Sequence, residues 1–76
     1  MNTGPKNIIG PRVRRLRRVA GMTIEQLAKM VAAQGGDLCA SDLRKIERRE
    51  RRVKDHEVLR LANALGVDLE TLFPNR

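Results

Sequence analysis

Residues 23–47, TIEQLAKMVAAQGGDLCASDLRKIE, hold two segments whose apolar residues recur at helical spacing, joined by a glycine pair. Thr23 is followed three positions later by Gln26, the pattern of a capping box in which each side chain satisfies a free backbone N–H of the other. This pattern predicts a helix that begins at Thr23. Its expected buried positions are Leu27, Ala28 and Val31. The run Gln-Gly-Gly-Asp at 34–37 ends the helix, because consecutive glycines favour a loop.

A second helical segment follows the glycine pair. Its apolar positions are Leu38, Leu43 and Ile46. The side chains expected to point away from the core are Ala40, Ser41, Arg44 and Lys45. The run RRERR at 48–52 has no apolar residue and is interpreted as an exposed helix end and loop.

The segment before residue 23 predicts another amphipathic helix. Its apolar face consists of Ile9, Val13, Leu16 and Ala20. Because proline is tolerated only in the first turn, Pro11 requires the helix to begin close to Ile8. Gly21 supplies the stop. Residues 1–7 are expected to form a flexible N-terminal arm, so that the domain spans 8–73.

Two further helical segments are predicted after residue 52. Asp55 is expected to cap a fourth helix, which Gly66 ends. The apolar stripe of that helix is Val58, Leu61, Ala62 and Leu65. Asp68 is expected to cap a short fifth helix, and Pro74 prevents its continuation, leaving 74–76 as a tail. The sequence therefore predicts a compact all-α domain of five helices without a strand.

Composition points to a polyanionic partner. The 76 residues carry sixteen Lys and Arg against nine Asp and Glu, a formal charge of +7, and most of the basic residues are arginine. Arginine reads phosphate and guanine well, because its planar group donates two parallel hydrogen bonds. The alternative is a charge that only keeps the protein in solution. Phe73 is the one aromatic residue, so aliphatic side chains must build the core.

Other features argue against an enzyme, a metal site or a membrane segment. Cys39 and His56 are the only cysteine and histidine and lie on different predicted elements, so we expect no disulfide, metal, cofactor or catalytic residue. Cys39 is either a half-buried residue replacing a serine cap or a thiol activated by the helix dipole. No apolar stretch is long enough for a membrane span, and we expect a cytoplasmic protein.

The order and spacing of these segments resemble the lambda-repressor and Cro type of helix-turn-helix domain, also called XRE-like. The segments that carry the resemblance are 17–21, 23–28, 43–47 and 61–73. It covers the chain from about Ile9 to Phe73 and is typical of a prophage or bacterial regulator. The resemblance implies that the second and third helices form the motif, with the third in the major groove of double-stranded DNA. It implies a sequence-specific transcriptional regulator, expected to be a repressor.

The resemblance also assigns roles to residues. Base readers would be Ala40, Ser41, Arg44 and Lys45, although Arg44 is also placed to contact phosphate. Phosphate contacts would come from Thr23 at the start of the second helix and from Arg48, Arg49, Arg51 and Arg52. Arg17 and Glu47 occupy positions where related domains have a structural ion pair; the alternative is two independent surface charges.

Three positions depart from the family pattern. The connection 32–38 is longer than the usual tight turn, so either the second helix extends or the loop bulges. Arg49 replaces a glycine of positive φ, so either the third helix continues or the site is strained. Ile24 occupies a position that is commonly a polar phosphate contact, so only backbone amides are expected to contact phosphate there.

A homodimer reading a palindromic operator is expected, formed either in solution or only on DNA. Its interface would be Val67, Leu69, Leu72 and Phe73, unless those side chains close the monomer core. Two other classes remain open: an antitoxin-like interaction module that represses its own operon, and a cationic peptide lying on a membrane surface. The regular apolar stripes favour a folded core over the membrane peptide.

Overall fold

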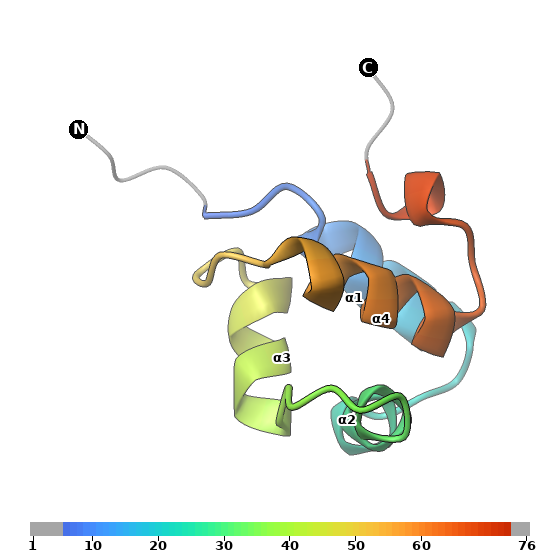
Figure 1. Ribbon diagram of the computed structural model, residues 1–76. Helices are drawn as coiled ribbons and strands as arrows, with labels where there is room; N and C mark the ends of the chain where they lie inside the picture. Colours follow the sequence, from blue (N-terminus) through green and yellow to red (C-terminus); the bar gives the residue numbers. More distant parts are fainter. Residues whose placement is uncertain (1–5, 74–76) are drawn as a thin grey trace.

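The computed structural model describes residues 6–73 as four α-helices followed by one 3₁₀ helix (Figure 1). They are α1 (Gly10–Val19), α2 (Ile24–Ala32), α3 (Ala40–Glu47), α4 (Asp55–Leu65) and η1 (Leu69–Leu72). Residues 6–73 contain no strand, as the sequence predicts. Of the five predicted helices, four are α-helices and the last is the 3₁₀ helix η1, so the five-helix count is not confirmed. The N–H groups of Thr71 and Phe73 bond to carbonyls three residues back, which is the pattern of a 3₁₀ helix.

Local capping explains where α2 and α4 begin. Thr23 Oγ1 accepts from the Gln26 N–H at 3.1 Å, and Gln26 Oε1 accepts from the Thr23 N–H at 2.8 Å, which is the predicted capping box. For α4 the predicted cap is displaced by one residue. Lys54 is the N-cap and Asp55 already belongs to the helix, because Glu57 reaches back to accept from the Lys54 N–H at 2.9 Å.

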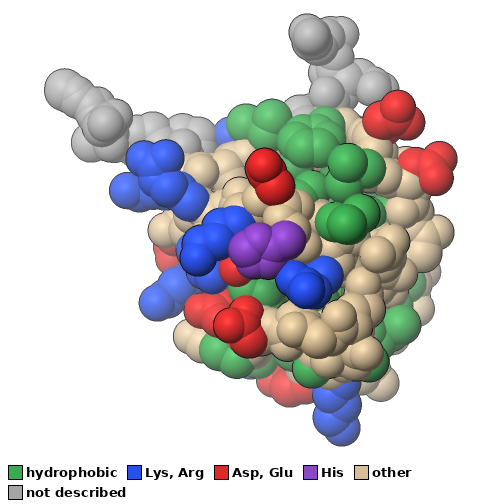
Figure 2. Space-filling view, viewed as in Figure 1, with side chains coloured by type: hydrophobic (Ala, Val, Ile, Leu, Met, Phe, Trp, Pro, Cys, Tyr) green, Lys and Arg blue, Asp and Glu red, His purple; other side chains and the backbone are tan. Residues whose placement is uncertain are grey.

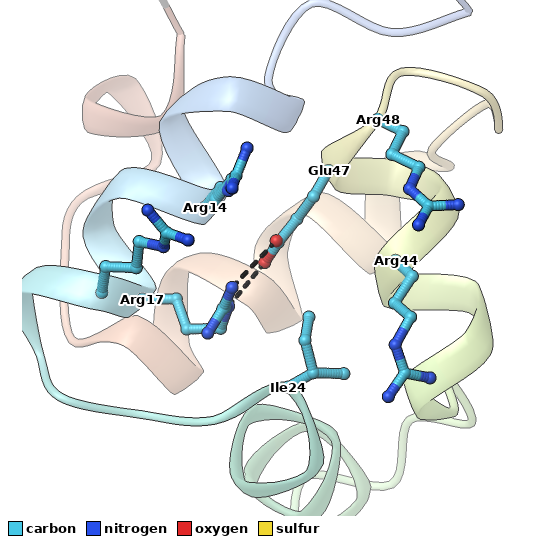
Figure 3. A pocket seen from close by; sticks show the side chains of 7 residues that line it. Arg14, Arg17, Ile24, Arg44, Glu47 and Arg48 are labelled. Carbon is cyan, nitrogen blue, oxygen red and sulfur yellow. Dashed lines mark hydrogen bonds and ion pairs between the residues drawn. The ribbon is translucent and has the colours of Figure 1, made fainter.

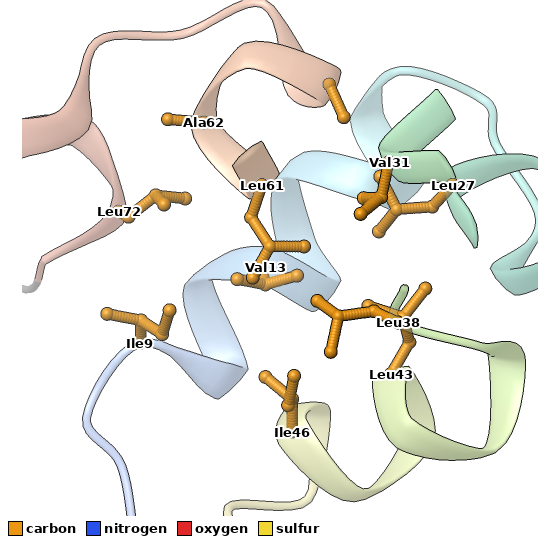
Figure 4. Close-up of a cluster of buried hydrophobic side chains, with 11 residues drawn as sticks. Ile9, Val13, Leu27, Val31, Leu38, Leu43, Ile46, Leu61, Ala62 and Leu72 are labelled. Carbon is orange, nitrogen blue, oxygen red and sulfur yellow. The ribbon is translucent and has the colours of Figure 1, made fainter. Parts of the chain in front are cut away.

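The aliphatic core lies between the four helices (Figure 4). Its buried members are Ile9, Val13, Leu27, Val31, Leu38, Leu43, Ile46, Leu61, Ala62, Ala64 and Leu72. Most expected core positions are buried or half-buried, including Leu16, Ala28, Val58 and Leu65. Ala20 is an exception and is exposed, because it follows the last residue of α1.

The long connection between α2 and α3 is a packed loop and not an extension of α2. The helix ends at Ala32, and Gly35 adopts a φ of +89°, which only glycine takes easily. Gln34 Nε2 donates to the carbonyl of Arg60 on α4 at 2.9 Å, and Leu38 is buried. The loop therefore contributes to the core before α3 begins.

Of the two alternatives for Arg49, a continuing helix or a strained backbone, the structure shows the strained backbone. Arg49 has a φ of +64°, and the Arg49 and Glu50 N–H groups bond to the carbonyls of Ile46 and Lys45, the Schellman pattern. A side chain in this left-handed conformation costs on the order of 1–2 kcal/mol. The cost is offset in part because Arg49 Nε donates to the Asn7 carbonyl at 3.0 Å and the Arg49 carbonyl accepts from Lys6 N–H.

These contacts bring the chain before α1 onto the α3–α4 turn. Asn7 Nδ2 donates to the carbonyls of Arg51 at 2.7 Å and Ile46 at 3.2 Å, while its Oδ1 accepts from Gly10 N–H. The expected arm therefore differs from the structure at Lys6 and Asn7, which are hydrogen-bonded to the domain. Its residues 1–5 and the tail 74–76 lie outside the described residues.

Candidate nucleic-acid interface

The four residues expected to read bases all lie on α3, and three of them are exposed. Ser41, Arg44 and Lys45 are open to solvent, and Ala40 at the start of the helix is half-buried. Leu43 and Ile46 are fully buried and hold the opposite face of α3 against the core. The helix thus presents polar and basic groups from a rigidly held support.

Arg44 has a partner that sequence reasoning did not identify. Its Nη2 lies 2.9 Å from Glu25 Oε2 on α2, and both side chains are about half exposed, at 49% and 62%. Exposed ion pairs of this kind contribute little to stability, so the guanidinium can exchange Glu25 for another anion at small cost.

The start of α2 has the expected backbone geometry. Thr23 is exposed, and its hydroxyl is engaged in the capping box. The first N–H groups of a helix have no intrahelical acceptor, which favours an anion there. The Ile24 side chain is half-buried and packs against the core, so it offers no polar contact.

The basic turn 48–52 divides into two kinds of arginine. Arg48 and Arg52 are exposed, whereas Arg49 and Arg51 are half-buried and committed to contacts within the protein. Arg51 donates from Nη1 and Nη2 to the two carboxylate oxygens of Glu57, at 2.9 and 3.1 Å. Arg51 was expected to contact phosphate, and in the structure its guanidinium is paired with a buried carboxylate.

Glu57 is the buried charged residue that sequence reasoning missed. Its side chain is 5% exposed and is held by Arg51 and by the Lys54 N–H. The hydrogen bond from Arg51, more than any other contact, lowers the pKa of Glu57, and the same bond raises the pKa of Arg51. The sequence signal that could have identified Glu57 is its position three residues after the N-cap, because a glutamate there often accepts a hydrogen bond from the N-cap N–H.

Arg17 and Glu47 form the ion pair that the resemblance implies (Figure 3). Arg17 Nε and Nη2 donate to Glu47 Oε2 and Oε1 at 2.7 and 3.1 Å, and Nη1 donates to the Met22 carbonyl at 2.8 Å. The hydrogen bond to Glu47 raises the pKa of Arg17. Because both side chains are largely buried, the pair joins the end of α1 to the end of α3.

The residues expected to form a dimer interface do not form one surface. Leu72 is fully buried in the core, and Val67 is half-buried against it, so the monomer already uses both. Leu69 and Phe73 remain exposed, together with Leu59 of α4. Figure 2 shows hydrophobic side chains gathered beside the C-terminal end of the described chain.

Cys39 and His56 are both exposed. Cys39 is the N-cap of α3 and is more open than the half-buried cap expected; its Sγ lies 3.4 Å from Asp42 Oδ2. His56 lies in the first turn of α4. Among residues 6–73, no group of three His, Cys, Asp or Glu side chains is placed to hold a metal ion. No helix in this range is long and apolar enough to span a bilayer.

Comparison with known proteins agrees with this geometry. A family model described as a helix-turn-helix domain matches residues 8–72. The restriction-modification controller protein C.AhdI from Aeromonas hydrophila is similar in structure, with a TM-score of 0.77 and 34% identity over 86% of this chain and 87% of that chain. The DNA-binding domain of BldD has a TM-score of 0.75 at 24% identity, over 97% of this chain and 100% of that chain, a likeness of fold alone. No curated protein sequence matches the chain. The chain belongs to the helix-turn-helix domain family, in the lambda-repressor and Cro type that its sequence resembles.

Proposed function

We propose that this protein is a transcriptional repressor that binds double-stranded DNA sequence-specifically, with α3 in the major groove. The observation that carries the proposal is the exposed, polar and basic face of α3, held from behind by Leu43 and Ile46. A helix of this kind fits the major groove and can present side chains to base edges. The similarity to a controller protein of a restriction-modification system supports a regulatory role.

The geometry supports a division of labour between specificity and affinity. Ser41 and Lys45 are exposed, and Lys45 has no ion-pair partner among the described residues. Both are the proposed base readers, with Ala40 placed to touch a thymine methyl group. Arg48 and Arg52 are the proposed phosphate contacts from the basic turn, together with the backbone at Thr23. Phosphate contacts position the protein but do not choose sequence.

We further propose that two copies bind a palindromic operator, because one recognition helix reads only a few base pairs. Leu59, Leu69 and Phe73 are the exposed apolar residues that a second copy would cover. Leu72 is excluded from this surface, since it is fully buried in the monomer.

Selection from a library of random duplexes tests the function directly. We expect enrichment of one palindromic motif. Ser41→Ala and Lys45→Ala should each cost about 1–3 kcal/mol against the selected duplex and relax preference at one position. Arg52→Ala, which removes an exposed charge from the basic turn, should weaken binding to all sequences alike. Failure to enrich any motif, or equal effects of the two kinds of substitution, would contradict the proposal.

A further inference from the structure

A notch with a volume of about 260 Å³ opens between α1, the start of α2 and α3 (Figure 3). Its lining residues are Arg14, Arg17, Arg18, Ile24, Arg44, Glu47 and Arg48. The volume is several times the roughly 30 Å³ that one water molecule occupies, so a hydrated anion fits. None of the base or phosphate contacts considered above comes from α1, yet α1 supplies three of these side chains.

The charge of the notch is strongly positive. Five guanidinium groups face one carboxylate, a formal +4 from the lining residues, and that carboxylate is already paired with Arg17. Glu25 is the other nearby carboxylate and is half exposed beside Arg44. Among the described residues, Arg14, Arg18 and Arg48 have no ion-pair partner. Like charges gathered in one concave site repel each other, and an anion placed between them relieves that repulsion.

The position of Ile24 strengthens the case for an anion in the notch. Ile24 is the first residue of α2, where backbone N–H groups lack intrahelical acceptors and the helix dipole is positive. Its side chain lines the notch without a polar atom. Any side-chain contact to an anion at this helix end must therefore come from the arginines of α1 and α3.

We propose that the notch holds one backbone phosphate of the bound duplex and that Arg14 and Arg18 of α1 are phosphate-binding residues. The inference rests on the proposed function, since it names contacts of that same DNA complex. Arg48, the C-cap of α3, closes the opposite side of the notch (Figure 3). In this proposal α1 extends the interface beyond the two helices of the helix-turn-helix.

The test uses the intact protein and the duplex recovered by the selection described above. Single methylphosphonate substitutions remove one phosphate charge at a time along each strand. Wild-type protein should lose affinity most at the few phosphates that it contacts. In Arg14→Gln/Arg18→Gln, one of these positions in each half-site should become insensitive. The magnitude of the slope of log K against log salt should fall by about 2, since each of the two bound copies gives up one neutralised phosphate and each phosphate contributes about 0.9.

The same helix offers a charge-matched control. Arg12 and Arg15 lie outside the notch and line a hollow with Ile8, Pro11 and Arg49; Arg15 also borders Arg14 and Arg18 in a neighbouring hollow. Arg12→Gln/Arg15→Gln removes the same net charge and should leave every methylphosphonate-sensitive position unchanged. Arg14→Lys/Arg18→Lys keeps the charge and should retain most of the salt slope. Thermal unfolding of each variant checks that the fold is kept.

The outcomes separate this inference from the proposed function. If wild-type protein selects no duplex, both are overturned. If wild-type protein binds but Arg14→Gln/Arg18→Gln keeps the full sensitivity profile and salt slope, the phosphate notch alone is overturned. The phosphate notch alone is also overturned if the Arg12 and Arg15 control loses as much phosphate sensitivity and salt slope as the notch variant.

Discussion

Arg51→Met should destabilise the fold, in contrast to what substitution of a free phosphate-binding arginine would do. The change keeps most of the length of the side chain but removes both hydrogen bonds to Glu57, at 2.9 and 3.1 Å. Glu57 would then keep only the Lys54 N–H as a hydrogen-bond donor among the contacts described above. A carboxylate that is 5% exposed would lose its ion-pair partner.

The size of the effect follows from the burial of the two partners. Breaking a buried pair by removing one member costs about 3–5 kcal/mol. The Arg51 side chain is 26% exposed, so water can replace part of its contact, and we expect about 2–3 kcal/mol. A chain of this length has a total stability of roughly 4–11 kcal/mol. At about 4–8 °C per kcal/mol, the melting temperature should fall by roughly 10–20 °C.

Urea unfolding followed by far-UV circular dichroism measures this difference. Arg52→Met is the matched control, because it removes the same charge from the neighbouring, exposed position. The control should change the free energy of unfolding by no more than about 0.5 kcal/mol. Equal destabilisation by the two variants would refute the structural role of Arg51, as would a loss below about 1 kcal/mol, half the expected minimum.

The pH dependence gives the same reasoning a second readout. The pKa of Glu57 in the folded state is lowered from 4.5. The stabilisation by the pair is therefore fully present above about pH 4.5 and is lost as the pH falls through the lowered pKa. In Arg51→Met, burial favours the protonated carboxyl, so the stability gap between variant and wild type should be large at pH 7 and shrink in acid. A gap that widens in acid would contradict this account.

Two further substitutions test how α1 is docked. Gly10→Ala should destabilise the domain by about 1–3 kcal/mol, although alanine is the better helix former, because its Cβ would collide with the Ile46 carbonyl; chemical denaturation showing a stabilised variant would count against this packing. Arg17→Met should lower the free energy of unfolding by about 3–5 kcal/mol. A double-mutant cycle with Glu47→Met should give a coupling energy well above 1 kcal/mol. Additive effects of the two substitutions would show instead that the two charges act independently.

Local signals in the sequence account for much of the helical framework. Thr23 and Gln26 are three residues apart on one turn, so their capping box could be recognised without knowing the rest of the fold. The apolar spacing within each segment likewise identifies the core face, as Leu27 and Val31 show. Such signals work because the interacting residues are near neighbours along the chain. The order of the segments then carried the resemblance to the family that the comparisons confirm.

Contacts that depend on how the chain turns between helices could not be predicted in this way. Arg51 was grouped with its basic neighbours because nothing in the run 48–52 shows which side chain turns inward toward Glu57. Leu72 was assigned to an interface, because an apolar residue in a short terminal turn can cover its own core or a partner's surface. Its burial depends on how η1 packs against α4.

The chain's own residues therefore indicated the four α-helices and the strongly basic character of the protein, and the resemblance to a known family implied that α2 and α3 make the motif. The side chains available to a polyanion depend on tertiary placement. Arg14 and Arg48 are 34 positions apart and line the same notch only because α1 and α3 pack side by side. The physical reason is the separation along the chain of the residues that interact. Capping hydrogen bonds and apolar periodicity act within a turn or two of helix, whereas charge neutralisation and burial depend on elements that folding brings together.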